Sequence, residues 1–243
     1  MTKTSCLIRI FLRSLSIQSS FNFWRMQNIG FAFAVIPLIK SAGMDAAQAS
    51  ELLKRHLQLF NTHPYLTGPT LGAVVKMEEE AKDGRLVSDL KVTLMGPYAA
   101  MGDTFFWGAW RPFAAIGAVV LMMESVSWAP LIFLFLYNPL HFYVRVQGFV
   151  EGYRRGMRGI DFIGRLNLPG LAGKIRWITV MLLGILTMLL FHSSGNAYAV
   201  VPELLRGFLF LGVILLCFMM ITRGISVMKI LYGTVAIFLL VSV

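Results

Sequence analysis

The chain has 243 residues, of which 57% are hydrophobic and only 14% are charged. Soluble globular proteins are about 45–50% apolar and about 25% charged, so this composition excludes an ordinary water-soluble domain and indicates a membrane protein. Lysine and arginine outnumber the acids by 22 to 12. In a membrane protein such an excess is typical of cytoplasmic loops and of contacts with anionic lipid headgroups, so no nucleic-acid partner is expected.

The first forty residues, 1–40, predict a helix on the membrane surface followed by a short apolar segment. From Cys6 to Ser20 the polar residues recur at helical spacing, with leucine and isoleucine between them. This is the pattern of an amphipathic helix that lies in the lipid interface, and no small-residue cleavage site follows it, so a cleaved signal peptide is not expected. The apolar run from Ile29 to Ile39 ends around Pro37 and is too short to cross a bilayer.

The next segment, residues 41–91, has the composition of a helical layer on the cytoplasmic side. Asp45 is expected to begin its first helix, in which Glu51 lies four residues before Arg55, a spacing that supports a helix by ion pairing. The polar face of this helix is expected to point to water. Its apolar positions recur at helical spacing and are Ala49, Leu52, Leu53, Leu57 and Phe60.

Residues 92–140 hold two apolar segments that are interrupted. A Gly96–Pro97 pair breaks the first, and polar residues around Glu124 break the second, which runs from Phe113 to Tyr137. Each half of the second segment has about twelve residues, or about 18 Å of helix, against a hydrocarbon core about 30 Å thick. The pattern leaves open one kinked span or two half-helices that re-enter, and broken helices of this kind are typical of transport sites.

The remainder of the chain predicts a basic loop and a group of membrane helices. Arginine and lysine concentrate in residues 141–174, which are therefore expected to form a cytoplasmic loop. Residues 175–243 contain three apolar runs, which predict three transmembrane helices whose flanking cations reach the headgroups. The predicted fold class is all-α: a polytopic membrane protein with an interfacial N-terminal helix, re-entrant or broken helices and three C-terminal transmembrane helices. The glycines interpreted as points of close helix packing are Gly148, Gly152, Gly156 and Gly159.

Candidate binding residues gather just after the interfacial helix. Asn22, Trp24, Arg25 and Gln27 place amides and a guanidinium among aromatic rings. Such groups bind sugars, because amides and charged groups take the hydroxyls while an aromatic face covers the ring's C–H surface. Trp24 alone is equally explained as an interfacial anchor, and Arg25 alone as a lipid contact.

Two further candidates are an isolated acid and an amide. Asp103 lies in an apolar segment, where a charge is costly and usually faces a cavity, a partner or a ligand; the structural alternative is an ion pair with Arg111. Asn61 belongs to an Asn-Thr-His-Pro run, and Asn and Pro also serve simply to end a helix. For Asp103 and for Asn61, the functional and the structural interpretation both remain open.

Catalysis and metal binding are not expected. The four histidines, His56, His63, His141 and His192, have no metal-ligand spacing with acids, and no nucleophile lies beside a base. The two cysteines lie far apart in the chain, so neither a disulfide framework nor a zinc site is predicted. No catalytic residue, metal or cofactor is therefore assigned.

Four strings carry a family resemblance. In chain order they are FNFWRMQNIGFAFAVIPLI, RHLQLFNTHPYLTGPTLG, KVTLMGPYAAMGDTFFWGAWRPFAAIGA and GYRRGMRGIDFI. Together they resemble the enzyme IID component of the mannose/fructose/sorbose family of the bacterial phosphoenolpyruvate:sugar phosphotransferase system. The resemblance runs from about Arg9 to the C-terminus.

The resemblance implies a non-catalytic, multi-pass subunit of the bacterial cytoplasmic (inner) membrane. Such a subunit works with a IIC membrane partner to carry a hexose of the mannose class inward, while cytoplasmic IIA and IIB proteins carry phosphate and phosphorylate the sugar. The family is thought to move a sugar-holding core against a fixed scaffold and to assemble as a trimer of IIC/IID pairs. Matching its strings points to Asn22, Arg25, Gln27, Asn61 and Asp103 as pocket or coupling candidates.

One departure from the family pattern bears on function. The family usually places Glu before the Arg-Met-Gln run, whereas this chain has Trp24 there, which removes a strong acceptor for sugar hydroxyls. A structural membrane partner of a IIC-like protein without direct sugar contact therefore remains an alternative at this point. An unrelated channel or secondary transporter is a separate alternative.

Overall fold

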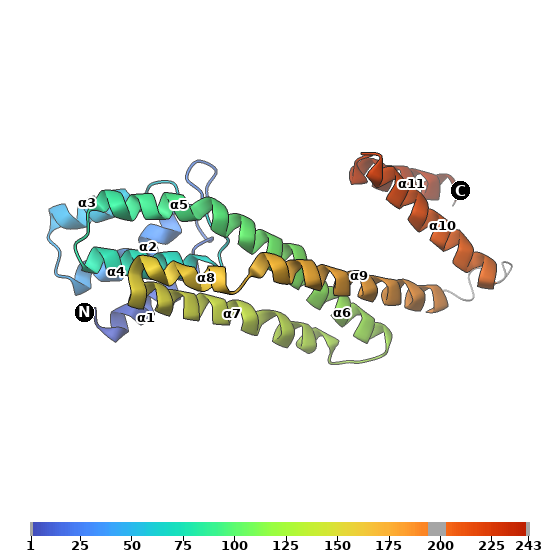
Figure 1. Ribbon diagram of the computed structural model, residues 1–243, viewed down its shortest axis with the longest axis horizontal. Helices are drawn as coiled ribbons and strands as arrows, with labels where there is room; N and C mark the ends of the chain where they lie inside the picture. Colours follow the sequence, from blue (N-terminus) through green and yellow to red (C-terminus); the bar gives the residue numbers. More distant parts are fainter. Residues whose placement is uncertain (1, 194–202, 242–243) are drawn as a thin grey trace. The chain divides into compact units, whose positions relative to one another are not determined.

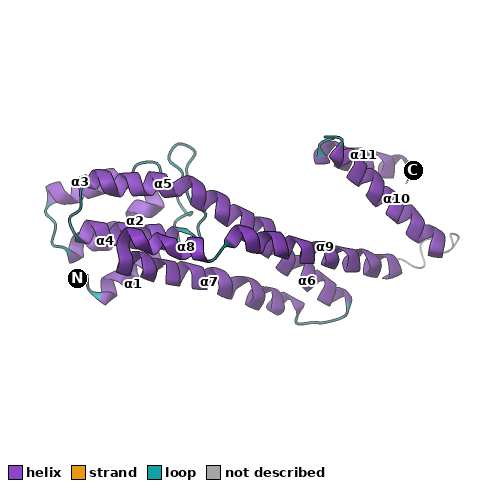
Figure 2. Ribbon diagram, in the orientation of Figure 1, coloured by secondary structure: helices purple, strands orange, loops and turns teal. Residues whose placement is uncertain are grey.

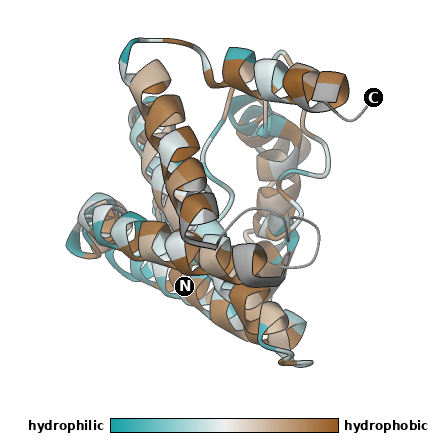
Figure 3. Ribbon diagram, turned by 90° about the vertical axis from the view of Figure 1, so that its right-hand side faces the viewer, coloured by the Kyte–Doolittle hydropathy of each residue, from teal (hydrophilic) through white to brown (hydrophobic). Residues whose placement is uncertain are grey.

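The computed structural model describes residues 2–193 and 203–241, and within them every named element is a helix (Figures 1 and 2). This confirms the all-α class. The chain forms two compact units, Met1–Leu189 and Leu190–Val243, which are described separately. Within the described residues two helical stretches are long and apolar enough to cross a membrane, Gly84–Met123 and Ala129–Leu190. Hydrophobic residues predominate along much of the helical ribbon in Figure 3.

The N-terminal helix α1, Thr4–Ser14, is shorter than predicted. It was expected to continue to Ser20, but hydrogen-bonded turns follow Ser14 instead. The serine hydroxyls explain this end, because Ser14 Oγ donates to the carbonyl of Phe11 at 2.6 Å and Ser16 Oγ donates to that of Arg13 at 2.9 Å. Such local side-chain bonds compete with helix continuation.

Helix α2, Asn28–Ser41, contains the short apolar run and packs against α1 as a core helix. Phe31, Ala34 and Val35 are fully buried. A side chain at Gly30 would collide with the backbone of Ile17, so glycine is required for the close approach of these two segments.

Helices α3, Ala46–His56, and α4, Thr67–Glu79, form most of the predicted helical layer. Asp45 begins α3 as predicted, in a reciprocal capping box with Gln48. The expected Glu51–Arg55 pair is wrong: Arg55 makes two hydrogen bonds of 2.9 Å to Glu78 on α4. A bidentate, largely buried carboxylate is a better partner for arginine than an exposed one.

One continuous helical stretch follows, made of α5, Gly84–Gly102, the π-helix η1, Asp103–Trp110, and α6, Arg111–Met123. The interruption expected at Gly96–Pro97 is wrong, because Pro97 lies inside α5. An interior proline costs about 3 kcal/mol, but Leu94 and Tyr98 on either side are buried in the core, and this packing holds the helix together. The irregularity of the stretch lies instead at η1.

The second predicted interruption is present and forms a helical hairpin. Residues 124–128 form a turn, with Ser125 at a positive φ of 61°, between α6 and α7, Ala129–Arg155. The sequence left open one kinked span or two half-helices of about twelve residues; the structure has two helices joined by a turn, and each continues beyond the apolar run. The stretch ending at Met123 has 40 residues, and α7 has 27. Each arm is therefore long enough to span.

The basic segment expected as a loop at 141–174 is mostly helical. Residues up to Arg155 belong to α7, followed by the 3-10 helix η2, Gly156–Ile160, and the short helix α8, Asp161–Arg165. Arginine and lysine are good helix formers, so their abundance locates charge without predicting a loop. Three helices follow in the expected order: α9, Leu168–Ser193, α10, Glu203–Thr222, and α11, Val227–Val241.

The closest helix contact in the first unit is between α4 and α7. A Cβ at Gly152 would lie 2.9 Å from the backbone nitrogen of Ala73, and one at Gly72 would lie 2.7 Å from that of Tyr153. Glycines on both helices therefore let the two backbones touch. This confirms the packing role predicted for Gly152; Gly148 faces the ring of Pro69, and Gly159 touches the backbone of Glu151.

Candidate functional site

Two loops of the first unit are joined by side-chain amides. Asn22 and Met26 exchange backbone hydrogen bonds of 2.9 and 3.0 Å, which close a tight turn. Gln27 donates from Nε2 to the carbonyl of Thr62 at 2.7 Å and accepts from its backbone nitrogen at 3.1 Å. Asn28 donates to the carbonyl of Leu57 at 2.7 Å. The segment 22–28 is thereby fastened to the segment 57–62.

The structure brings most of the predicted candidates to this junction but uses them differently. Gln27 is buried, and its amide is occupied on both sides by Thr62. Asn22 donates to Asn28 Oδ1 at 2.8 Å. Asn61 is half-buried next to Thr62. The amides of Asn22 and Gln27 hold the turn in place.

The tip of the same turn is exposed. The side chains of Phe23 and Trp24 are 87% and 88% exposed, and Phe21 is 54% exposed. Arg25 is exposed as well, and its guanidinium reaches the carbonyl of Leu57 at 3.4 Å. Exposed aromatic rings grouped beside an arginine are characteristic of contact with lipid, a partner or a ligand.

Asp103 lies at the start of η1, beside a second cluster. A Cβ at the preceding Gly102 would overlap the His63 ring, so the two are in direct contact. His63 stacks on Phe106 with ring centroids 5.3 Å apart and meets the edge of Trp107 at 4.7 Å. Asp103 itself is exposed, and no ion pair with Arg111 or any other cation is present among the described residues. The structural pairing considered for Asp103 is therefore absent there.

His63 belongs to a polar and aromatic cluster that the sequence pattern does not single out. Tyr65 stacks on His141 at 4.2 Å, Arg145 lies 4.8 Å from the Tyr65 ring, and the Tyr65 and Tyr137 hydroxyls are 3.1 Å apart. Burial, with help from nearby Arg145, lowers the pKa of His63 to about 3, so its ring is neutral. The one sequence signal for this cluster was Arg145, a cation on the side of α7 that faces α4 and the loop before it.

A buried ionic network lies behind the junction. Burial opposes ionisation of Glu78, yet hydrogen bonds from His56 and Arg55 outweigh it and hold the pKa of this carboxyl below its usual value. His56 Nε2 is 3.0 Å from Glu78 and its Nδ1 is 3.5 Å from Lys91 Nζ. Burial lowers the pKa of His56 to about 4, so neutral His56 donates to Glu78 and accepts from Lys91. Three helices, α3, α4 and α5, are linked by this network.

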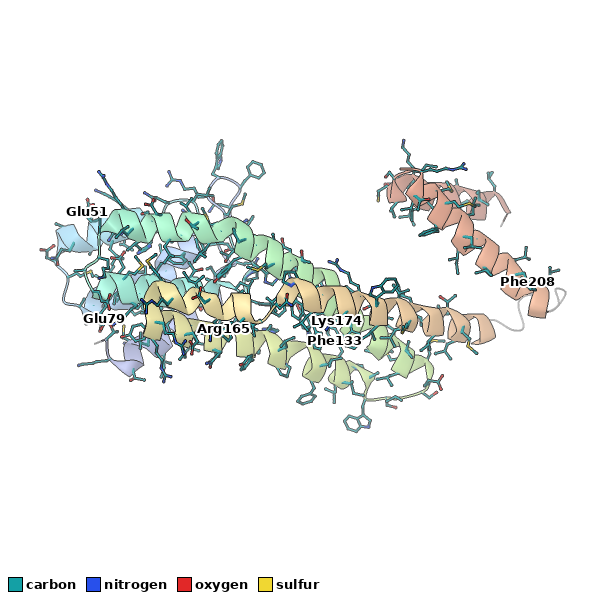
Figure 4. All side chains as sticks on the ribbon, in the orientation of Figure 1. Glu51, Glu79, Phe133, Arg165, Lys174 and Phe208 are labelled. Carbon is teal, nitrogen blue, oxygen red and sulfur yellow. The ribbon has the colours of Figure 1, made fainter. Side chains whose placement is uncertain are left out.

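Among the residues searched, which are those the structure describes, no group of three His, Cys, Asp or Glu side chains is placed to hold a metal ion. The polar network sits at one end of the first unit, and the long helices extend from it; Figure 4 shows Glu51 and Glu79 at that end and Phe133 and Lys174 further along. These features define an α-helical protein whose described residues include two stretches long and apolar enough to cross a membrane.

The comparison with known families is specific. The family described as "PTS system mannose/fructose/sorbose family IID component" matches residues 2–243. The chain therefore belongs to the IID components of the mannose/fructose/sorbose family of the phosphotransferase system. The predicted resemblance is confirmed.

Individual relatives agree with this assignment. The "Fructose permease IID component" of Bacillus subtilis (strain 168) is 33% identical over 253 residues, which cover 93% of this chain and 90% of that protein. The "PTS system mannose-specific EIID component" of Escherichia coli (strain K12) is 39% identical over 162 residues, covering 64% of this chain and 57% of that relative.

Two solved structures have the same fold. One, described as "Structure of membrane protein", has a TM-score of 0.72 and 27% identity, and the match covers 98% of this chain and 96% of that one. The other, "CryoEM Structure of Mannose Transporter ManYZ and Microcin E492 (MceA) complex", has a TM-score of 0.60, the same identity and the same coverage.

Proposed function

We propose that this chain is the IID subunit of a sugar permease that carries a hexose of the mannose class across the bacterial cytoplasmic membrane together with a IIC subunit. It performs no chemistry itself; IIA and IIB phosphocarriers phosphorylate the sugar. IIC/IID pairs assemble as trimers. Support comes from the family match over residues 2–243, from mannose- and fructose-specific relatives and from the likeness to a mannose transporter.

The length of the α6–α7 hairpin supports a position for the membrane in this proposal. Asp103 is about twenty residues before the turn at 124–128, and Phe149 is about twenty residues after Ala129, so each arm rises about 30 Å, the thickness of the hydrocarbon core. Tyr65 touches both Phe106 and His141, so the two arms approach each other through this side chain. In this proposal the hairpin and α9, α10 and α11 span the membrane, while α1 and the layer of α3 and α4 lie at one surface.

The observation that carries a sugar-contacting role is the environment of Asp103. It is an exposed carboxylate in an apolar helical stretch, at the first residue of a π-helix, with no cation paired to it among the described residues. π-helical turns occur frequently at functional sites, and a charge at membrane depth usually faces a ligand or a partner. We assign Asp103, Trp24 and Arg25 to direct contact with the sugar or the IIC subunit, and Asn22, Gln27 and Asn61 to positioning the Trp24 turn.

A second candidate function is supported by Trp24. The family's usual glutamate at this position is replaced by an exposed indole, and the neighbouring amides are engaged within the chain. Without that carboxylate the chain would act as a structural partner of IIC, which would hold the sugar alone.

Uptake of radiolabelled mannose in cells that contain this chain, its IIC partner and the phosphocarriers, but no other mannose permease, tests the proposal. Asp103→Asn removes one charged hydrogen bond, worth about 1.5–3 kcal/mol, so we expect uptake to fall at least tenfold while the IIC/IID pair still purifies. Trp128→Ala is the matched control, because Trp128 is a 69% exposed indole at the far turn of the hairpin.

The two candidate functions differ in their response to Trp24→Glu. If the chain contacts sugar through its present residues, this substitution changes the Michaelis constant and the parent transports. A parent that binds no labelled hexose, and gains binding with Trp24→Glu, would establish the structural role instead. Unchanged uptake in Asp103→Asn would contradict the assignment of Asp103.

A further inference from the structure

A cavity between α1 and α2 is lined by residues that have no part in the proposed contact with the sugar or the IIC subunit. It measures about 300 Å³, the lower end of the range for small-molecule sites. Among the described residues, four cations line it and no acid does. The charged and hydroxyl side chains in its wall are Lys3, Ser5, Arg9, Arg13, Lys40 and Ser41.

These cations are not neutralised from within the described part of the chain. Arg13 donates to the carbonyl of Phe33 at 3.2 Å and covers that ring at 4.5 Å. Lys3, Arg9 and Lys40 have neither a carboxylate within 4.0 Å nor a side-chain hydrogen bond among the described residues. By contrast Lys76, the one cation of α4, is paired with Glu80 at 3.2 Å. Four like charges around one hollow create a positive potential that favours the binding of an anion.

The level of α1 in the molecule identifies the anion. Phe11 of α1 packs on Phe149 with ring centroids 5.7 Å apart, and Phe149 lies about 30 Å along α7 from the hairpin turn. That distance equals the thickness of the hydrocarbon core. With the hairpin placed across the membrane, α1 lies where lipid headgroups are. Figure 1 shows α1 at the same end of the first unit as α3 and α4, opposite to the α6–α7 turn.

The outer surface of α1 completes a lipid site. Ile8 and Leu12, one turn apart on this helix, are 54% and 56% exposed. A helix with exposed apolar side chains on one side and arginine and lysine on another binds at the membrane interface. Its apolar side chains contact the acyl chains, and its cations contact the anionic headgroups. A free anion in solution would need only the cations for binding and would make no use of the exposed Ile8 and Leu12.

We propose that the α1–α2 cavity binds the phosphate of an anionic phospholipid, with Arg9 and Lys40 as its principal contacts and with Ile8 and Leu12 against the acyl chains. The inference rests on the membrane placement proposed above. The bound lipid holds the N-terminal helix α1 on the membrane surface. There α1 lies next to the core that is formed by α2 and the segment carrying the Trp24 turn.

Native mass spectrometry of the co-purified IIC/IID pair tests this, with phosphatidylglycerol and phosphatidylcholine titrated in equal amounts. We expect the parent to retain phosphatidylglycerol preferentially. Each cation near anionic lipid contributes about fivefold in affinity, so Arg9→Gln with Lys40→Gln should lower this binding about 25-fold. Lys54→Gln removes an equally cationic, 73% exposed side chain on α3 and should leave it unchanged.

A second arm separates lipid from free phosphate. Ile8→Ser with Leu12→Ser should weaken phosphatidylglycerol binding at least threefold, and inorganic phosphate at millimolar concentration should not displace the lipid. The proposal is overturned if the parent has no preference for phosphatidylglycerol, if the double cation variant binds like the parent, or if phosphate displaces the lipid and the apolar variant binds normally. Labelled mannose uptake by the parent, measured separately, shows whether the transport function stands whichever result is obtained.

Discussion

Replacing Glu78 by glutamine is expected to destabilise the first unit strongly. Glu78 is the only acid that contacts Arg55 and His56 among the described residues, and its side chain is 6% exposed. Glu78→Gln leaves Arg55 and Lys91 near each other without an anion. Breaking a buried pair by removing one partner costs about 3–5 kcal/mol. Because the Arg55 side chain is 22% exposed and partly solvated, we expect the lower end, about 3 kcal/mol.

The magnitude is measured by unfolding the co-purified IIC/IID pair in detergent with increasing denaturant, followed by tryptophan fluorescence. The matched control is Glu80→Gln, since Glu80 is 42% exposed and pairs with Lys76 and Lys82; such surface pairs contribute at most about 1 kcal/mol. Adding Lys91→Met to Glu78→Gln should recover part of the loss, because a second unpaired charge is then removed. Equal effects of Glu78→Gln and Glu80→Gln would refute the reasoning.

Three further outcomes are expected. The pKa of His56 is about 4 in the folded chain and 6.5 in the unfolded chain. The contribution of neutral His56 to the free energy of unfolding is therefore complete above pH 6.5 and is lost as the pH falls to 4, a change of about 3 kcal/mol. His56→Gln should remove most of this pH dependence of the unfolding free energy, measured at pH 7 and 4.5. Gly152→Ala forces α7 away from α4 and should cost about 1–3 kcal/mol, whereas Gly96→Ala, where a Cβ meets nothing within 4 Å, should stabilise by up to about 1 kcal/mol in the same assay. Arg176 donates to the carbonyls of Thr104 and Gly108 at 3.3 Å, so Arg176→Gln should lower stability by about 1–2 kcal/mol, and an effect no larger than that of Lys174→Gln would contradict this role.

Hydrophobic pattern and local caps predicted much of the helical framework. The Asp45 cap, the interruption around Glu124 and the order of the C-terminal helices follow from short-range signals that the structure contains. The error at Gly96–Pro97 arises because burial of flanking side chains outweighs a proline's local cost. The hairpin arms were predicted too short because hydropathy marks the apolar part of a helix and not its full length.

Less of the candidate site than of the helical framework could be predicted from the sequence. The run around Arg25 indicated a polar cluster, but whether an amide faces a ligand or another loop depends on partners about 30 positions away, such as Thr62 for Gln27. The same holds for Arg55, whose partner Glu78 lies on another helix. Tyr65 and His141 meet only because α4 and α7 cross at small residues. Contacts of this kind follow from tertiary packing and leave no periodic signal.

The wide turn of η1 has a consequence for numbering within the family. A turn closed by i→i+5 bonds takes in about one residue more than an α-helical turn, and one residue corresponds to about 100° of rotation about the axis. Side chains of α6 therefore point about a quarter turn away from where the phase of α5 would put them. Deleting one residue between 103 and 110 would let the chain return to a regular helix, and the side chains from Arg111 to Met123 would keep their present directions. A gap of a single position is therefore tolerated here, whereas the same gap within α6 itself would rotate the remainder of that arm by about 100°.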